Sequence, residues 1–175
     1  MTDAELRIGF ARAFLSQARS DWEVYKLLRT TDLPACHQLH YLQMAGEKLA
    51  KAYRLRDTFS PIQELTAHHT GFAKFMKQYL LSPRFKDRYA GRTAQLQSLM
   101  RDAEKLAREI ERLAPAIEKA QVPANTEYPW EAGGRVIAPC EWSFEALSLL
   151  KASRGRTFLK LLEEAFRDYD ETELA

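Results

Sequence analysis

The sequence predicts an all-α fold, an antiparallel bundle of helices with one long ordered loop rich in proline, glycine and aromatic residues. Apolar residues recur in steps of three and four through most of the 175 residues, and helix-start signals divide this pattern into separate helices. A chain of this length fits one domain. We therefore expect a single helical domain over 1–175. It divides into core helices in 1–82, a further bundle helix in 83–120, a non-helical loop in 121–141 and two C-terminal helices in 142–170.

The first two helices are predicted on either side of Pro34. Thr2 and Glu5 have the spacing of a capping box, so we expect a first helix over about 3–30. Proline is tolerated in the first turn of a helix and not in its interior, so a second helix is expected over 34–56. Gly46 lies beside the inward face of this helix and permits the close approach of another helix, at some cost in helix propensity.

The later helices are bounded by similar signals. Ser60-Pro61-Ile62-Gln63 combines an N-cap serine, a proline at the first helical position and a capping glutamine, and predicts a helix that continues to Leu81. Ser82-Pro83 ends it. The remaining helices are expected over 84–89, 92–114, 141–151 and 154–169.

The loop is the segment QVPANTEYPWEAGGRVIAPC, which has three prolines, two adjacent glycines and no helical period. A non-helical stretch of this length inside a compact domain tends to be either functional or disordered. Tyr128, Trp130, Val136 and Ile137 favour burial and argue for a packed loop. A short strand pair is expected at 135–138.

Composition excludes several classes of protein. The net charge is +2, from 26 basic and 24 acidic residues that mostly alternate, so no dense basic stripe for nucleic acid is present. The N-terminus lacks the pattern of a signal peptide, and no segment has the ~20 apolar residues of a membrane span. Cys36 and Cys140 lack metal-site spacing and are expected to be free thiols in a reducing compartment. We expect a cytoplasmic protein without membrane association.

Motifs for cofactors and metals are also missing. The sequence contains no GxxxxGK[ST], GxGxxG or GxSxG segment. His37 and His40 have a chelating spacing on one helix. In a hairpin of the second and third helices, however, His68 lies about 10 Å from His40 along the axis, at 1.5 Å rise per residue. We therefore expect neither a metal site nor a cofactor.

Three segments resemble a known family. HQLHYLQMAGEKLAKAYRL (37–55) contains Gln43-Met44-Ala45-Gly46-Glu47-Lys48-Leu49-Ala50-Lys51-Ala52, which is similar to a Q-A-x-E-K-x-x-K-A pattern. ARSDWEVYKLL (18–28) resembles an A-x-x-D-x-x-x-A-x-x-LL helix, and His68 or His69 resembles the histidine of a T-H-x-L segment. Over about the first 80 residues the chain thus resembles HEPN domains, the higher eukaryote and prokaryote nucleotide-binding helical bundles.

The resemblance implies a homodimer whose partner is a nucleotide, RNA or a cognate protein in a defence or toxin–antitoxin type system. Ribonucleases of that family carry an arginine followed, after four to six residues, by a histidine. This chain has no such pair, since seven residues separate Arg29 from His37. We therefore expect a catalytically silent binding module. Two alternatives stay open: a non-standard, metal-independent ribonuclease that uses Arg29 with His37 or His40, and a purely structural oligomerisation domain.

The resemblance also suggests Glu47, Lys48 and Lys51 as ligand-binding residues, because it places their helix at the dimer or ligand groove. A plainer interpretation is that Glu47 and Lys51 form an exposed pair, four residues apart, on a solvated helix face. Such a pair contributes only about 0.2–0.5 kcal/mol.

The loop supplies the other candidate ligand-binding residues, Tyr128, Trp130, Glu131 and Arg135. Aromatic rings beside carboxylates suit stacking on a base or binding a cationic group. The alternative is that Trp130 and Trp142 close one end of the bundle while the glutamates face water. If a ligand site exists, we expect it where this loop meets the helix segment 37–51.

Overall fold

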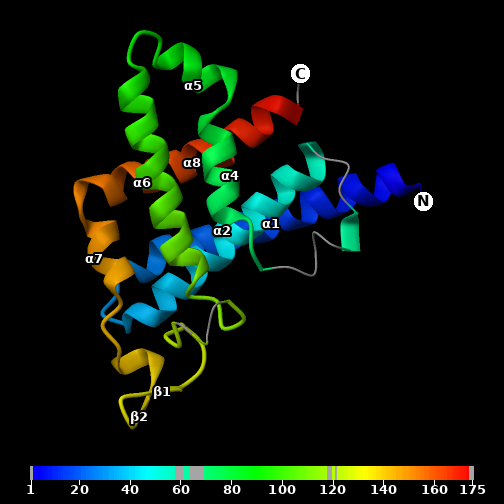
Figure 1. Cartoon of the computed structure of the whole chain (residues 1–175). Helices are drawn as coiled ribbons and strands as arrows, with labels where there is room; N and C mark the ends of the chain where they lie inside the picture. Colours follow the sequence, from blue (N-terminus) through cyan, green and yellow to red (C-terminus); the bar gives the residue numbers. More distant parts are fainter. Residues whose placement is uncertain (1, 58–60, 64–68, 118–119, 121, 174–175) are drawn as a thin grey trace.

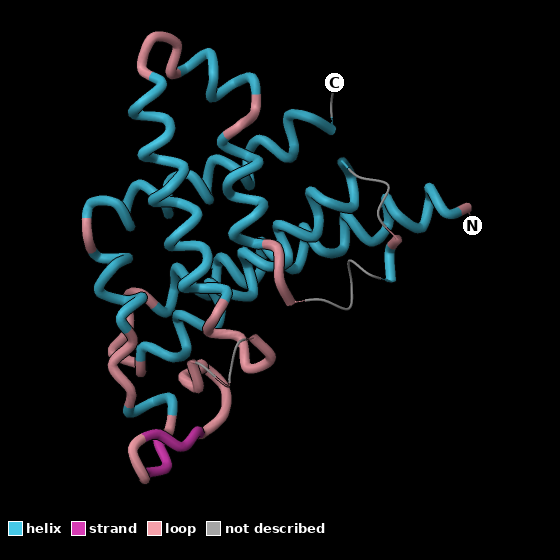
Figure 2. The backbone as a smooth tube through the Cα atoms, viewed as in Figure 1, coloured by secondary structure: helices cyan, strands magenta, loops and turns pink. Residues whose placement is uncertain are grey.

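The computed structural model describes residues 2–57, 61–63, 69–117, 120 and 122–173, with the backbone alone for 170–173. Within these ranges the chain is all-α apart from one small hairpin, as the sequence predicts (Figures 1 and 2). The helices are α1 (Asp3–Leu28), α2 (Ala35–Asp57), α4 (Phe72–Leu80), α5 (Pro83–Arg88), α6 (Thr93–Glu111), α7 (Glu145–Lys151) and α8 (Ser153–Glu173).

The helices form two antiparallel pairs, and α2 belongs to the first of them. α1 and α2 lie against each other along much of their length, and α4 and α6 form a second pair that crosses them (Figure 1). α8 passes behind α4 and α6 in this view, and α7 leads into it. α2 contacts α1, α4, α6 and α8, and its residues 45–47 and 49–53 are all buried. Consecutive buried residues on a helix cover its whole circumference, so α2 is the central helix of the bundle.

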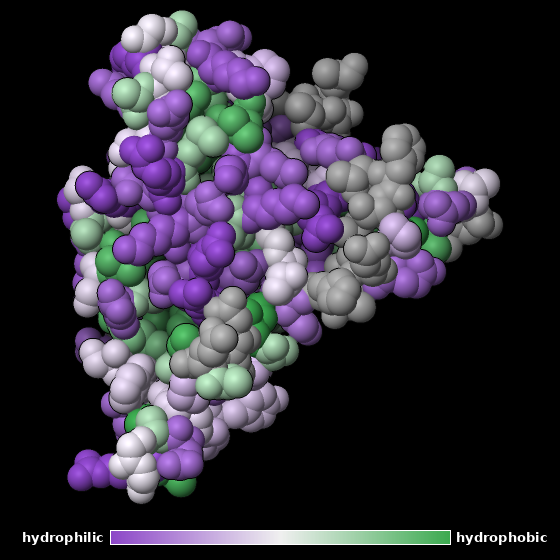
Figure 3. Space-filling model, in the orientation of Figure 1, coloured by the Kyte–Doolittle hydropathy of each residue, from purple (hydrophilic) through white to green (hydrophobic). Residues whose placement is uncertain are grey.

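The outward faces of α4 and α6 are mainly polar. Figure 3 shows hydrophilic residues over both helices, with apolar residues scattered among them. Such a surface is normal for helices that bury one stripe only. None of the helices in the described ranges is long and apolar enough to cross a lipid bilayer.

The first two helices begin and end close to where the sequence predicts. The capping box at the start of α1 is present, because Thr2 Oγ1 accepts from the Glu5 amide at 3.2 Å and Glu5 Oε2 accepts from the Thr2 amide at 2.7 Å. α1 ends two residues before the expected Thr30. α2 lies within one residue of the range 34–56 at each end.

The single helix expected from Ser60 to Leu81 is not continuous, because it is interrupted at Gly71. Gly71 has φ +123°, which an α-helix excludes, and α4 begins only at Phe72. Glu111 of α6 explains the break, because its Oε1 accepts hydrogen bonds from the amides of Gly71 and, at 2.8 Å, of Phe72. A carboxylate on another helix thus caps α4. Ser60, which carried the helix-start signal, lies outside the described residues.

Two later boundaries also differ from expectation. α7 begins at Glu145 and not at Glu141, because Pro139–Glu141 form a short 3-10 turn (η1) followed by extended backbone at Trp142. α8 continues to Glu173, beyond the expected end of the C-terminal helices at residue 170.

Gly46 is the point at which α4 docks on α2. A Cβ atom at position 46 would lie 2.5 Å from Cζ of Phe72, whose ring is buried and lies edge-on to Phe158. Only glycine leaves room for this ring, which confirms that Gly46 permits a close approach.

We expect Gly46→Ala to lower the free energy of unfolding by about 1–2 kcal/mol. Overpacking costs about 1–3 kcal/mol, and the gain in helix propensity is at most about 1 kcal/mol. Gly9→Ala is the matched control, because Gly9 lies in α1 with nothing within 4 Å of its added Cβ. The control should stabilise the protein by about 0.5–1 kcal/mol. Urea denaturation of both variants measures the difference, and a stabilising Gly46→Ala would contradict this packing.

An ion-pair network joins α5 to α8. Arg84 donates to Glu164 Oε1 at 2.8 Å and also pairs with Asp168, while Arg88 binds both oxygens of Glu164. The hydrogen bond from Arg88, together with the charges of the arginines, lowers the pKa of Glu164 from its ordinary 4.5. A carboxyl whose pKa is lower in the folded state stabilises the fold above its unfolded pKa, and this stabilisation is lost as the pH falls through the folded value.

We therefore expect Glu164→Gln to destabilise the protein by about 1 kcal/mol or less at neutral pH, since both arginines are partly exposed. The difference from wild type should shrink between about pH 5 and pH 2, where the wild-type carboxyl takes up its proton. Thermal unfolding across this pH range measures it, with Glu163→Gln at the exposed neighbouring position as control. A difference that stays constant with pH would show that the network contributes nothing through charge.

Candidate functional site

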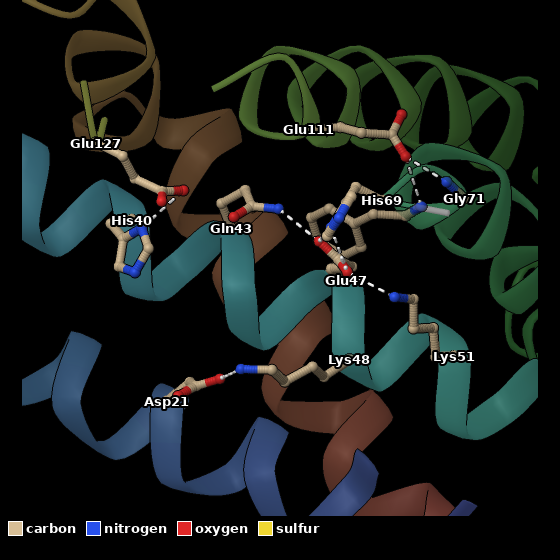
Figure 4. Close-up of polar contacts among 11 residues, drawn as sticks. Asp21, His40, Gln43, Glu47, Lys48, Lys51, His69, Gly71, Glu111 and Glu127 are labelled. Atoms are coloured by element: carbon tan, nitrogen blue, oxygen red, sulfur yellow. Dashed lines mark hydrogen bonds and ion pairs between the residues drawn. The ribbon is translucent and has the colours of Figure 1, made fainter. Parts of the chain in front are cut away.

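A cavity lies where α2 meets the segment after α6 and the long loop, and its lining mixes polar and apolar residues. We call it the α2 cavity. It has a volume of about 280 Å³ and is lined by His40, Gln43, Met44, Glu47, His69, Ala114, Pro115, Ala116 and Glu127. Figure 4 shows the polar residues of this region, with Glu47 at its centre and His40 and Glu127 together at one side.

The Glu47 carboxylate is buried and fully engaged. It is 5% exposed, and it accepts hydrogen bonds from Lys51 Nζ at 2.7 Å and Gln43 Nε2 at 2.9 Å. His69 Nδ1 lies 3.2 and 3.3 Å from its two oxygens. Lys51 is itself only 5% exposed. The interpretation of Glu47 and Lys51 as an exposed pair on a solvated face is therefore wrong, because α4 and α6 pack over this face.

Two residues that line the cavity each have a buried polar atom without a hydrogen-bond partner among the described residues. Gln43 is 2% exposed, and its Oε1 has no donor. His40 Nδ1 lies 3.6 Å from Glu127 Oε1, within ion-pair range but too far for a hydrogen bond. An unsatisfied buried polar atom costs about 1–3 kcal/mol, so each one calls for an explanation.

The loop holds Glu127 at the cavity through a buried asparagine. Asn125 is 5% exposed, and its Oδ1 accepts hydrogen bonds from the amides of Glu127 at 2.9 Å and Tyr128 at 2.7 Å. The amide of Thr126 donates to Leu113 O at 3.2 Å, which ties the loop to the end of α6. Glu127 is thus fixed by backbone bonds and does not depend on a ligand for its position.

The chemistry of the wall is that of a hydrogen-bond acceptor. The polar residues of the wall are two glutamates, one glutamine and two histidines, and the ammonium of Lys51 is bound to one of these glutamates, Glu47. In the described part of the chain, no group of three or more histidine, cysteine, aspartate or glutamate residues is arranged to hold a metal ion. The arrangement suits a small ligand that donates hydrogen bonds.

Lys48, expected as a ligand-binding residue, lies on the opposite side of α2. It points toward α1, where its Nζ lies 2.5 Å from Asp21 Oδ2 (Figure 4). Asp21 is 5% exposed and also accepts from Gln17 at 3.0 Å. Lys48 therefore joins α1 to α2 and does not line the α2 cavity.

The loop candidates are placed away from Glu47. Strands β1 (Trp130–Ala132) and β2 (Arg135–Ile137) form an antiparallel hairpin, with positive φ at Gly133 and Gly134 as a two-residue turn requires. A strand pair is thus present, but only its second strand lies in the expected range 135–138, and its first strand begins five residues earlier at Trp130. Glu131 and Arg135 are exposed on it, and Tyr128 before it is 60% exposed.

Trp130 has a packing role. It is 8% exposed, belongs to the main core and meets Trp142 edge-on, with ring centroids 5.6 Å apart. Trp142 is 40% exposed, so only Trp130 closes the end of the bundle as the alternative interpretation proposed.

The candidate ribonuclease residues do not share a cavity. Arg29 has its guanidinium 5.7 Å from the centroid of the Tyr25 ring and lines a separate cavity with Gln38, whereas His40 lines the α2 cavity. His37 is exposed. The structure therefore does not bring Arg29 and His40 to one reaction centre.

Gln43, His69 and Glu127 line the cavity but were not among the expected site residues. The sequence holds one signal for them: polar residues at 40, 43, 47 and 51 follow helical steps of three, four and four along the helix. Such a polar stripe indicates a common face. That His69 and Glu127 come to the same face depends on the packing of the segments that carry them.

Comparisons with known proteins assign no family. No family model matches the chain, and no solved structure matches it. A cytochrome b5-related protein from Drosophila virilis is 38% identical to this chain over 48 residues, which is 27% of this chain. The matched segment is 34% of that protein's length, so the similarity concerns about a third of it.

We expect Glu47→Gln to lower the free energy of unfolding by about 3 kcal/mol, because it removes the charge that compensates a buried ammonium. Glu23→Gln is the matched control: Glu23 and Lys26 are 2.7 Å apart, and their side chains are 68% and 41% exposed. The control should change stability by less than about 0.5 kcal/mol. Chemical denaturation of the two variants tests this, and equal effects would show that the Glu47–Lys51 pair behaves like a surface pair.

Proposed function

We propose that the chain is a catalytically silent, HEPN-like binding module whose α2 cavity binds the base of a nucleotide. The observation that carries the proposal is Oε1 of Gln43, which is buried and has no donor among the described residues, in a residue that lines a cavity. A ligand that donates to this atom removes the cost of leaving it unsatisfied.

The exocyclic amino group of a nucleobase suits this wall. Carboxylate and amide oxygens accept from the amino groups of cytosine and adenine, which is how side chains recognise these bases elsewhere. In the α2 cavity, Gln43 Oε1 and the Glu127 carboxylate are the acceptors. His40 donates or accepts at Nδ1 according to its tautomer, so it can complete the edge of the base.

The size and charge of the cavity favour a single base over a longer strand. Ligand pockets begin at about 300 Å³, and the 280 Å³ of this cavity lies just below that limit, which favours a ligand as small as a single base. Glu47 and Glu127 repel a phosphate, and His69, whose side chain is 55% exposed, marks the open side. The base therefore enters first and the phosphate stays in solvent. A nucleotide fits this cavity better than RNA or a cognate protein.

Two features favour a binding role over cleavage of a substrate. The Glu47 carboxylate already accepts hydrogen bonds from Gln43 and Lys51, so it is poorly placed to take a proton from a substrate. The arginine–histidine motif is missing, and Arg29 and His40 line different cavities.

The homodimer that the resemblance implies remains part of the proposal, and native mass spectrometry of the purified chain tests it.

We expect the protein to bind CMP at least tenfold more tightly than UMP, as measured by isothermal titration calorimetry. The two nucleotides differ in the amino or oxo group that meets Gln43, so they form a matched pair. Gln43→Met should abolish the preference for CMP. Gln97→Met, at an exposed position of α6, should leave it unchanged.

Ala116→Trp provides a second test that leaves the buried polar residues intact, because Ala116 is exposed and lines the cavity. It should weaken CMP binding at least tenfold while the melting temperature stays the same. If CMP and UMP bind equally well, or if CMP binds the Ala116→Trp variant normally, the α2 cavity is not a base-binding site.

A further inference from the structure

A second cavity lies at the other end of α2, and it shares no residue with the α2 cavity. Its volume is about 390 Å³, and its walls come from the last turn of α2, from α4, from the start of α5 and from α8. We call it the tyrosine–arginine cavity after Tyr53, Tyr79, Arg54, Arg56 and Arg84, which line it.

The floor of this cavity is aromatic and uncharged. Tyr53, Phe75 and Tyr79 are each at most 9% exposed, and the centroid of the Phe75 ring lies 4.8 Å from that of Tyr53 and 5.9 Å from that of Tyr79. The hydroxyl of Tyr53 donates to Ala165 O at 2.7 Å, and that of Tyr79 to Asp168 Oδ2 at 2.6 Å. Burial raises the pKa of both tyrosines, and in Tyr79 the bond to Asp168 adds to it. The hydroxyls are therefore neutral and occupied, which leaves the rings as the contact surface.

The rim is rich in arginine. Three arginines line the cavity together with two aspartates, Asp57 and Asp168, and Arg84 is also bonded to Glu164 outside the lining. The guanidinium of Arg56 lies 4.6 Å from the ring centroids of both Tyr53 and Tyr169, and it also pairs with Asp57. Stacked and paired guanidinium groups are held in one orientation before a ligand arrives, which lowers the cost of binding.

We propose that the tyrosine–arginine cavity binds a small aromatic carboxylate. The ring packs on the aromatic floor, where ring–ring contacts add about 0.5–1.5 kcal/mol beyond burial. The carboxylate meets the arginines of the rim, whose planar fork matches its two oxygens. A single negative charge is easier to accommodate beside the two aspartates than the two charges of a phosphate dianion. A cationic ligand would face three arginines.

This site is independent of the proposed base-binding function. The two cavities have no lining residue in common, and their chemistry is opposite: one presents acceptors and the other arginines on an aromatic floor. CMP is therefore not expected to compete with an aromatic carboxylate.

The probe is indole-3-acetate, with indole-3-acetamide as its neutral twin, titrated into the full chain and followed by calorimetry. We expect the acetate to bind at least tenfold more tightly than the amide. Gln78→Trp should remove acetate binding, because Gln78 is exposed and lines the cavity, so a large ring there fills the space without disturbing the core. Lys74→Trp is the matched control on the same helix, exposed and outside the cavity, and it should bind the acetate normally.

The Arg54→Gln variant tests the contribution of charge separately. It should weaken binding of the acetate at least fivefold and leave binding of the amide unchanged. Melting temperatures of all variants identify any that fail to fold. The proposal is overturned if the acetate does not bind the wild-type chain, if acetate and amide bind equally, or if Gln78→Trp binds the acetate as the wild type does.

Discussion

The central helix carries a buried ion pair, that between Glu47 and Lys51, which sets the polar contacts of the core around it. α2 is buried on nearly every side, so any charge that it carries must be compensated within the fold. The pair does this over 2.7 Å, and the remaining capacity of the carboxylate is taken by Gln43 and His69. The bond to Glu47 also fixes the amide of Gln43, because its nitrogen must face the carboxylate. Its oxygen is then left in the cavity wall without a donor, and the cavity acquires its acceptor character as a consequence of how the core is kept neutral.

α2 carries two sites of opposite chemistry because its polar residues are segregated along its length. The first half bears His40, Gln43 and Glu47, and the last turn bears Arg54 and Arg56. Arginines in the last turn of a helix are favoured by the negative end of its dipole. Their guanidinium groups also cover aromatic rings that α4 and α8 bring to this end, as the contacts of Arg56 with Tyr53 and Tyr169 show. One helix therefore supports a cavity with two glutamates in its wall and, at its C-terminal end, a cavity with three arginines in its rim.

Features that depend on near neighbours in the chain could be predicted, and those that depend on packing could not. The capping box at Thr2 and the close approach at Gly46 follow from local patterns, and both are present. The break at Gly71 could not be predicted, because the carboxylate that caps α4 comes from Glu111, forty residues further along the chain. The burial of Glu47 was missed for the same reason. A glutamate four residues before a lysine has the same pattern on a solvated face as in a core, and only the helices that cover it decide between the two.

The long loop acts as a fixed wall of the α2 cavity and not as a lid. Buried Asn125 accepts hydrogen bonds from two backbone amides and donates hydrogen bonds to two backbone carbonyl oxygens. These hydrogen bonds hold the turn that carries Glu127 in this position. Trp130 anchors the loop in the core a few residues later. A loop held at both points loses little freedom when a ligand binds, which favours affinity in a small cavity where few contacts are available. The hairpin beyond Trp130 contributes nothing to this wall, since Glu131 and Arg135 face solvent. The length of the loop is therefore explained by the need to bring Glu127 to His40 and then to return the chain, through Trp130 and η1, to the start of α7.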